Sequence, residues 1–488
     1  MRKLAFLWKV LKMCATLIVF NISGICYNIF ISERAPAAEI GLMHLVMNVY
    51  SFGVCLSVSG ISLTATRLLS DMPKDRAMTQ SEAIIAKCMK VCLFTSVFAG
   101  LILFFGADYI AKTFLANPKC AVSLKILSPA LVGVAISSVL SGYFTAFGMI
   151  GSLATGKLFA EITIWGITLW MMQNGSNQIQ NTVALATVAS SFIQCICDLI
   201  LWKKSCFSFG RVKTVISTKN VVSLCAPLAV GSYLRTGLGC VENLIIPSRL
   251  KAGGVDNALA KYGIIKGMSL PVMMFPYVIV GAFTSLIVPE IARRFSSGQT
   301  KSVRYISTIS IEYIMQFAIM ISAILYFWSD ELCAVFFKEP DASTYLKYLS
   351  LLPVLMFTDS TVDAILKGAN EQVYGLKVNI ADACARVILI YTLVPFFGTK
   401  AYIAVLYLSE FFNLCFSLRK LKKITALKPS KLRAVFVPLF GTFCGVISVN
   451  ILSADSVWAK IMMFAAVYVG TSETLHCTLK GSVSSCPQ

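Results

Sequence analysis

Histidine is nearly absent from this chain, and charged side chains are scarce. There are two histidines in 488 residues, and no DxD, HExxH or Cys-x-x-Cys motif occurs. Charged residues make up 14% of the chain, against about 25% in soluble domains. Loops large enough for a catalytic site are also missing. These absences argue against an enzyme, and the 17 scattered cysteines predict neither a zinc site nor a disulfide framework.

Apolar residues, in contrast, make up 57% of the chain, and the mean hydropathy is +0.77. Apolar runs of about 18 to 30 residues recur from end to end, long enough to cross a bilayer as helices. They do not alternate between apolar and polar residues, which excludes transmembrane strands. We therefore predict an all-α polytopic membrane protein with about fourteen helices, which begin near Leu11, Gly41, Ile84, Ala121, Ser152, Thr182, Val221, Gly263, Val303, Tyr345, Tyr374, Ala401, Leu432 and Val457.

The net charge of +20 is concentrated in alternate loops. Residues 203–219, 293–304 and 419–433 are strongly basic, whereas residues 173–181 contain no basic residue. Basic loops of membrane proteins lie on the cytoplasmic side, so we expect both termini and these three loops in the cytoplasm. The apolar stretch of the N-terminus, about 19 residues, is long for a signal peptide, and we interpret it as a retained first helix. The sequence has no basic patch interleaved with aromatic residues, so it gives no indication of nucleic-acid binding.

A weak internal repeat divides the chain. The stretch LKILSPALVGVAISS begins at Leu124 and LKYLSLLPVLMFTDS begins at Leu346, an offset of 222 residues that also takes Gly41 to Gly263. A shift of six helices preserves their direction, so the repeat predicts two parallel six-helix lobes. We place the lobes at residues 1–205 and 206–425, followed by two extra helices and a tail at 426–488. Such lobes typically enclose a cavity that opens alternately to each side.

The same offset pairs His44 with Lys266, and both lie about one turn into apolar helices. A charge in hydrocarbon is costly, so each side chain either reaches the outer interface or faces a wet cavity where it can meet an anion. Arg235 could join them in binding phosphate, whereas Arg67 is a weaker candidate because it suits an interface anchor. Four amides could contact a sugar or bridge helices: Asn21, Asn28, Asn48 and Asn243.

Acidic and amide residues inside the second half raise the question of a coupling ion. The candidate ligands for sodium or a proton are Glu242, Asp359, Asp363, Asn379 and Asp382. Asp363 and Asp382 each have a basic residue four positions later, Lys367 and Arg386, so these pairs could neutralise themselves instead. Glu242 has no such local partner and is the best candidate. Three further acids in apolar runs have no assigned role: Glu161, Asp198 and Glu410.

Several stretches resemble the multidrug/oligosaccharidyl-lipid/polysaccharide (MOP) exporter superfamily, in the branch of stage V sporulation protein B and polysaccharide exporters. The similar segments are GLMHLVMNVYSFGVCLSVSGISLTATRLLSD from Gly41, LKILSPALVGVAISSVLSGYFTAFG from Leu124, VENLIIPSRLKAGG from Val241, YGIIKGMSLPVMMFP from Tyr262 and IVPEIARRF from Ile287. The resemblance covers nearly the whole chain, but its motifs are patterns of small and apolar residues. The sequence departs from the pattern at His44, where glutamine is common, and at Asn48, where proline is common.

The resemblance implies a flippase similar to the lipid II flippases, with a fold like that of the multidrug exporters. Such proteins move polyprenyl-pyrophosphate-linked sugars to the outer leaflet of the cell membrane, and helices from Leu432 onward would hold the lipid tail. It implies no cofactor beyond sodium or a proton, and we expect a monomer. The alternative is a cation-coupled drug antiporter, which would favour an acidic, aromatic-lined cavity rather than basic residues. An enzyme acting on lipid-linked sugars is the least favoured alternative.

Overall fold

The structure is a computed structural model that describes residues 2–72, 74–115, 117–174, 178–206, 217–337, 339–425, 430, 432–452 and 456–484. Side chains are described for these residues except 2–17, 74–77, 150, 206, 228 and 476–484. The chain forms two compact units. The N-terminal unit contains Met1–Tyr27 and Arg34–Gly263, and the C-terminal unit contains Asn28–Glu33 and Ile264–Gln488. The first helix is therefore divided between them.

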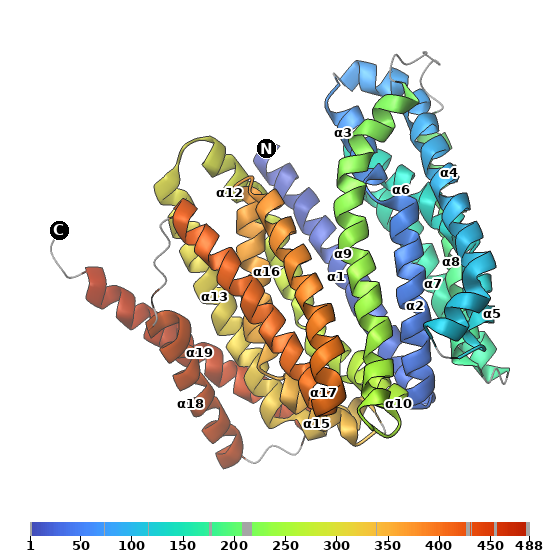
Figure 1. Ribbon diagram of the computed structural model, residues 1–488. Helices are drawn as coiled ribbons and strands as arrows, with labels where there is room; N and C mark the ends of the chain where they lie inside the picture. The colour runs from blue at the N-terminus through green and yellow to red at the C-terminus, as the bar shows by residue number, and fades with distance from the viewer. Residues whose placement is uncertain are drawn as a thin grey trace. The chain divides into compact units, whose positions relative to one another are not determined.

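Helix α6 occupies the centre of the N-terminal unit, where it packs against α2, α3, α4 and α8 (Figure 1). Its apolar face meets α4 around Ile84, Leu140 and Phe144, all nearly inaccessible to solvent. The helices of this unit are α1 (Arg2–Arg34), α2 (Ala37–Val58), α3 (Ile61–Ser70), α4 (Lys74–Thr113), α5 (Cys120–Leu127), α6 (Ala130–Ala146), α7 (Ile150–Gln173), α8 (Ile179–Cys206), α9 (Thr218–Ala252) and α10 (Ala258–Gly263).

Helix α16 has the corresponding role in the C-terminal unit, where it packs against α12, α13 and α17. Its core contains Ile291, Val362 and Ile365. The unit comprises the π-helical turn η1 (Ile264–Ser269), α11 (Leu270–Met274), α12 (Tyr277–Ser296), α13 (Thr300–Phe327), α14 (Ser329–Phe336), α15 (Asp341–Leu349), α16 (Leu352–Gly368), α17 (Gln372–Thr425), a second π-helical turn η2 (Leu432–Phe436), α18 (Val437–Leu452) and α19 (Val457–Ser484).

The internal repeat is visible in the helix boundaries. Helix α5 ends at Leu127 and α6 spans Ala130–Ala146, while α15 ends at Leu349 and α16 spans Leu352–Gly368. All three boundaries differ by the offset of 222 residues found in the sequence. A proline lies at or near each break, Pro129 and Pro353, and proline interrupts a helix because it lacks an amide hydrogen. The repeated sequence therefore forms the same broken helix twice.

The described residues include seven helices long and apolar enough to cross a membrane, or up to ten if each of three bent pairs is one span. The segment α17 consists of two helices that meet at Gly398, where the backbone is not helical (φ 60°, ψ −139°). At 1.5 Å per residue each half is about 40 Å long, enough for one crossing of a core of about 30 Å. Every predicted start lies within a helix, and the polytopic all-α membrane fold is confirmed. The total of fourteen spans stays a prediction.

Glycines allow an unusually close crossing of α2 and α10 in the N-terminal unit. A Cβ atom added to Gly41 would lie 2.5 Å from the carbonyl oxygen of Leu259, and one added to Gly263 would overlap the carbonyl oxygen of Ala37. Small residues let helix backbones approach in this way. The two glycines that the repeat offset pairs are thus in direct contact.

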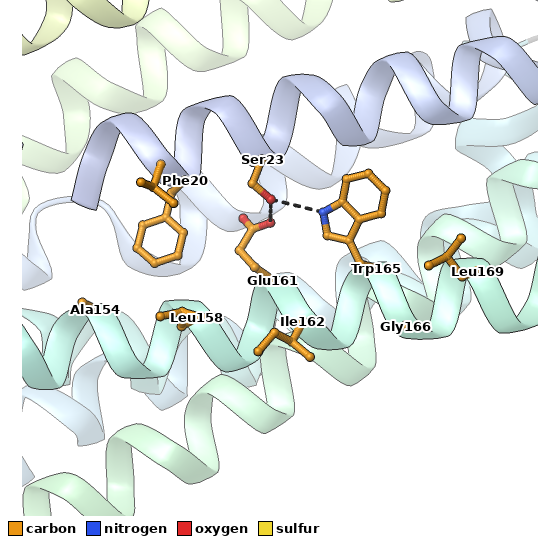
Figure 2. A pocket seen from close by; sticks show the side chains of 10 residues that line it. Phe20, Ser23, Ala154, Leu158, Glu161, Ile162, Trp165, Gly166 and Leu169 are labelled. Atoms are coloured by element: carbon orange, nitrogen blue, oxygen red, sulfur yellow. Dashed lines mark hydrogen bonds between the residues drawn. The ribbon is translucent and has the colours of Figure 1, made fainter. Parts of the chain in front are cut away.

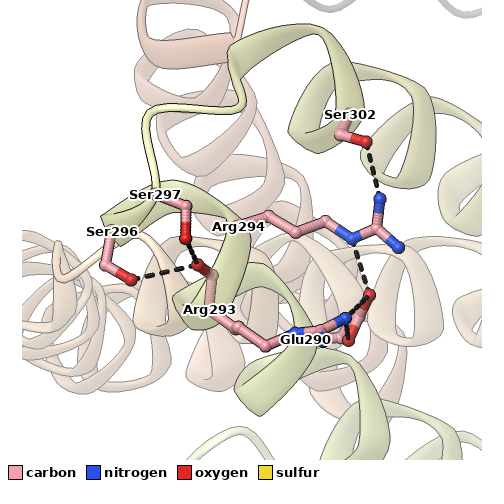
Figure 3. A network of polar contacts seen from close by, with 6 residues as sticks. All are labelled: Glu290, Arg293, Arg294, Ser296, Ser297 and Ser302. Carbon is pink, nitrogen blue, oxygen red and sulfur yellow. Dashed lines mark hydrogen bonds and ion pairs between the residues drawn. The ribbon is translucent and has the colours of Figure 1, made fainter.

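A charged network fixes the turn between α12 and α13 in the C-terminal unit (Figure 3). Both oxygens of Glu290 accept hydrogen bonds from Arg293, at 2.9 and 2.8 Å. Arg294 donates to Glu290 at 2.6 Å and to the hydroxyl of Ser302 on α13, also at 2.6 Å. Because Arg294 bridges both helices, their ends are held together across the turn.

Candidate functional site

A polar cluster joins three helices of the N-terminal unit. Asn243 on α9 donates to the side-chain oxygen of Asn48 on α2 at 3.2 Å, and the hydroxyl of Tyr262 on α10 donates to Asn243 at 3.3 Å. The amide of Asn48 donates in turn to the backbone carbonyl of His44 at 2.8 Å. Three predicted site residues are thus brought together. The two asparagines bridge helices here, which was the alternative to sugar contact.

Lys266 lies half-buried in the π-helical turn η1 of the C-terminal unit. Its ammonium nitrogen is 5.8 Å from the centre of the Tyr402 ring, a cation–π geometry. Ser32 donates to the backbone carbonyl of Gly267 at 3.1 Å. Among the described residues, no carboxylate forms an ion pair with Lys266. π-Helical turns are frequent at functional sites, and this one carries a cation that an aromatic ring, rather than an acid, stabilises.

The other predicted basic residues and amides have different surroundings. Arg235 on α9 is exposed, and so is Arg67 in the last turn of α3, as expected of an interface anchor. Asn21 is exposed in the N-terminal unit, whereas Asn28 is half-buried in the C-terminal unit. His44 is half-buried.

Carboxyl groups gather between α16 and α17 of the C-terminal unit. The carboxyl groups of Asp363, Asp382 and Glu410 lie close enough to Asp359 to act on it electrostatically. Ser417 donates to Asp363 at 3.2 Å, and Ser409 donates to Asp382 at 2.9 Å. The sequence prediction missed Glu410 and these serines. A pattern in the sequence could have indicated them, because polar residues recur every four positions and so lie on one helix face: Ser409, Asn413 and Ser417.

Only one of the two predicted ion pairs within a helix forms. Arg386 lies 3.4 Å from Asp382, whereas Lys367 is exposed and Asp363 bonds to a serine instead. One carboxyl oxygen of Asp359 is buried without a hydrogen-bond partner among the described residues. Over the same residues, no three His, Cys, Asp or Glu side chains are arranged to hold a metal ion.

The remaining candidate ligands occupy separate places. Asn379 is half-buried on α17. Glu242 is 4% exposed and belongs to the N-terminal unit. Glu242 is thus the one candidate ion ligand outside the C-terminal unit.

A groove of about 760 Å³ runs between α1 and α7 in the N-terminal unit (Figure 2). Its walls are almost entirely apolar, and its polar side chains belong to Ser23, Glu161 and Trp165. Ser23 donates to Glu161 at 2.9 Å, and the indole of Trp165 donates to Ser23 at 3.1 Å. The groove is lined by Val19, Phe20, Ser23, Ala154, Leu158, Glu161, Ile162, Trp165, Gly166 and Leu169.

Comparison with known proteins finds similarity in sequence and in fold. The chain is 21% identical over 411 residues to stage V sporulation protein B of Bacillus subtilis (strain 168), covering 80% of this chain and 78% of that protein. A lipid II flippase, MurJ, in an inward closed conformation superposes with a TM-score of 0.75 at 12% identity, covering 96% of this chain and 99% of that one. The chain has the fold of the MOP exporters.

A second MOP structure, an inward-facing multidrug resistance MATE family transporter, superposes with a TM-score of 0.66 at 13% identity, covering 83% of this chain and 95% of that one. No protein-family model matches the chain. The predicted resemblance to the MOP superfamily is confirmed. The two solved structures are named as a lipid II flippase and a multidrug resistance transporter.

Proposed function

We propose that the protein is a flippase that moves a polyprenyl-pyrophosphate-linked sugar from the cytoplasmic to the outer leaflet of the cell membrane by alternating access. The observation that carries this proposal is Lys266, a cation in an apolar π-helical turn that forms no ion pair with any carboxylate of the residues that the structure describes. The likeness to stage V sporulation protein B and the fold of a lipid II flippase support it. The precursor of a wall or capsule polysaccharide would be such a substrate.

The proposed chemistry begins with charge. A diphosphate head group carries negative charges that must be neutralised within the membrane, and a lysine ammonium supplies a compact positive charge. The face of Tyr402 stabilises this ammonium without neutralising it, so its charge stays available to an anion. In the N-terminal unit, Arg235 and His44 are the further candidates for phosphate contact, and Arg67 is the weakest because of its exposed position.

The sugar and the lipid tail need other surroundings. Asn48 and Asn243 already bond to each other, so a sugar could contact them only by replacing that hydrogen bond. Asn21 and Asn28 are the other sugar-contact candidates. For the tail, η2 and α18 carry large exposed apolar side chains, including Phe436 on η2 and Phe443 on α18, both at 63% exposure, and Ile451 on α18 at 74%. Such a surface suits a long isoprenoid chain.

We propose further that a sodium ion or a proton drives the cycle. The buried oxygen of Asp359 without a hydrogen-bond partner, and the three carboxyl groups around it, support a cation site between α16 and α17. Four carboxyl groups and one arginine, Arg386, leave this region short of positive charge. Glu242 would act separately, because it belongs to the other unit.

Flipping of a fluorescent polyprenyl-pyrophosphate sugar by the purified protein in vesicles tests the proposal. Lys266→Ala should lower the rate at least about tenfold, because it removes a charge-assisted contact, while Lys266→Arg should retain most activity and both variants insert normally. Full activity in Lys266→Ala would contradict the phosphate role.

The same vesicles test the coupling ion. A sodium gradient should raise the flipping rate of the native protein but not that of Asp359→Asn. Asp108→Asn, which changes a carboxylate on the surface, is the control and should respond to the gradient like the native protein.

The alternative function is a cation-coupled drug antiporter, since a MATE transporter shares the fold. Uptake of a cationic dye by the same vesicles separates the two functions. A dye antiporter would accumulate the dye against an ion gradient and leave the lipid-linked sugar in place.

A further inference from the structure

We propose that a basic surface of the C-terminal unit binds an anionic phospholipid of the cytoplasmic leaflet. This surface consists of five cations on the first turns of α13 and the last turns of α17: Lys301, Arg304, Arg419, Lys422 and Lys423. Arg304 is half-buried, and the other four are exposed. The two helix ends share one buried core, which contains Val303 and Leu421. The position of the basic surface on the cytoplasmic side rests on the proposed topology.

The acids next to the basic surface are already engaged. Both arginines of the turn between α12 and α13 pair with Glu290 (Figure 3), and Lys420 lies 2.9 Å from Glu371. Among the described residues, none of the five cations of the basic surface forms an ion pair. The positive-inside rule accounts for basic residues on this side of the membrane, but not for their gathering without counter-charges. Because like charges repel, a bound anion would stabilise this arrangement.

Aromatic rings place the basic surface at the depth of lipid head groups. The guanidinium of Arg419 lies 5.8 Å from the centre of the Phe416 ring, and the ammonium of Lys420 lies 5.3 Å from the centre of the Tyr374 ring. Tyr305 on α13 is 63% exposed. Aromatic side chains concentrate where a membrane meets water. The long stems of lysine and arginine let their charges reach the phosphates of the lipids there.

The surroundings of the five cations favour a lipid over a soluble anion. Free phosphate or an acidic protein segment would meet the charges but not the exposed apolar side chains beside them. These include Phe295 in the last turn of α12 and Phe416 on α17, at 39% and 37% exposure. An anionic phospholipid supplies a phosphate for the cations and hydrocarbon for the rings. Clusters of basic residues directly beside a membrane helix recognise anionic lipids in this way.

Titration of the full-length protein in detergent with phosphatidylglycerol, followed by native mass spectrometry, tests the proposal. The double variant Lys422→Gln/Lys423→Gln should weaken binding about tenfold to thirtyfold, because each basic residue near an anionic head group contributes about fivefold in affinity. Lys112→Gln/Lys119→Gln removes two exposed lysines from the N-terminal unit and should bind like the native protein. Equal affinities for the two double variants would overturn the proposal.

A second pair of measurements separates charge from fold. Lys422→Arg/Lys423→Arg keeps both charges and should bind phosphatidylglycerol like the native protein, and thermal unfolding of every lipid-free variant should match that of the native protein. Zwitterionic phosphatidylcholine should bind weakly and equally to all of them. Loss of phosphatidylglycerol binding in the arginine variant, or binding of phosphatidylcholine as tight as that of phosphatidylglycerol, would contradict recognition by charge.

Competition experiments separate a lipid from other anions and the basic surface from the transport site. Neither glycerol 3-phosphate nor hexaglutamate should displace phosphatidylglycerol, because both lack hydrocarbon. Displacement by either compound at an equal concentration would overturn the lipid assignment. Lys266→Ala should bind phosphatidylglycerol like the native protein, and a loss there as large as in Lys422→Gln/Lys423→Gln would place the lipid at the transport site instead. The titration contains no transported precursor, so this proposal and the proposed flippase function fail separately.

Discussion

At the scale of single residues, the close crossing of α2 and α10 in the N-terminal unit depends on two glycines, Gly41 and Gly263. The backbone at Gly263 lies so near the carbonyl of Ala37 that a Cβ atom has no room. Gly281 on α12 is different, because nothing lies within 4 Å of a Cβ atom added there. These two positions in apolar helices therefore provide a matched pair.

We expect Gly263→Ala to destabilise the protein by about 1 to 3 kcal/mol, because the added methyl group forces α2 and α10 apart. Gly281→Ala should be neutral or stabilising by up to about 1 kcal/mol, since alanine favours the helix more than glycine does. Thermal unfolding of the purified variants in detergent measures both effects. Equal unfolding temperatures for the two variants would show that the glycine contact is unimportant.

At the scale of helices, polar side chains of α13 attach the last two helices to the C-terminal unit. Glu312 is 4% exposed and accepts the backbone N–H of Ser430 at 2.9 Å, just before η2. The side-chain amide of Gln316 donates to the backbone carbonyl of Arg433 at 3.1 Å, and the backbone carbonyl of Gln316 accepts a hydrogen bond from the hydroxyl of Tyr468 on α19 at 2.7 Å. An acid at the start of a helix satisfies an otherwise free amide. These hydrogen bonds therefore attach to α13 the apolar surface of η2 and α18 that we propose contacts the lipid tail.

We expect Glu312→Ala to loosen η2 and α18, at a cost of about 0.5 to 2 kcal/mol, as for the loss of other helix caps. Hydrogen exchange of the amides in residues 432–445 should become about threefold to thirtyfold faster, because local opening becomes easier by that free energy. Tyr305→Phe, an exposed position on the same helix, is the control. Unchanged exchange in Glu312→Ala would show that packing alone holds these helices.

At the scale of the whole molecule, the proposed topology makes opposite predictions for two exposed turns. Ser297 lies in the basic turn between α12 and α13, and Asn174 follows α7 in a segment without basic residues. The positive-inside rule puts the first in the cytoplasm and the second outside the cell. In a cysteine-free background, Asn174→Cys should react with an impermeant maleimide in intact cells, and Ser297→Cys only after lysis. The reverse labelling pattern would show that the chain crosses the membrane in the opposite orientation, and it would contradict the proposed topology.

The sequence by itself determined the membrane-spanning helices and their repetition. Apolar length and proline position are local properties, so the predicted starts lie within helices, and the offset of 222 residues reappears in the boundaries of α5, α6, α15 and α16. The basic side chain of Lys266 was also evident as an isolated charge in an apolar run. Each of these features depends only on residues that are close together in the sequence.

Only the tertiary structure decided which polar side chains meet. It joined Asn48 to Asn243, replaced the expected partner of Asp363 with Ser417, and set Ser23 and Trp165 around a carboxylate, Glu161, to which the sequence had assigned no role. Such contacts depend on how each helix is rotated and on which helix lies beside it. Almost every face of these helices is apolar, so the sequence pattern does not specify that rotation, and packing between helices sets it.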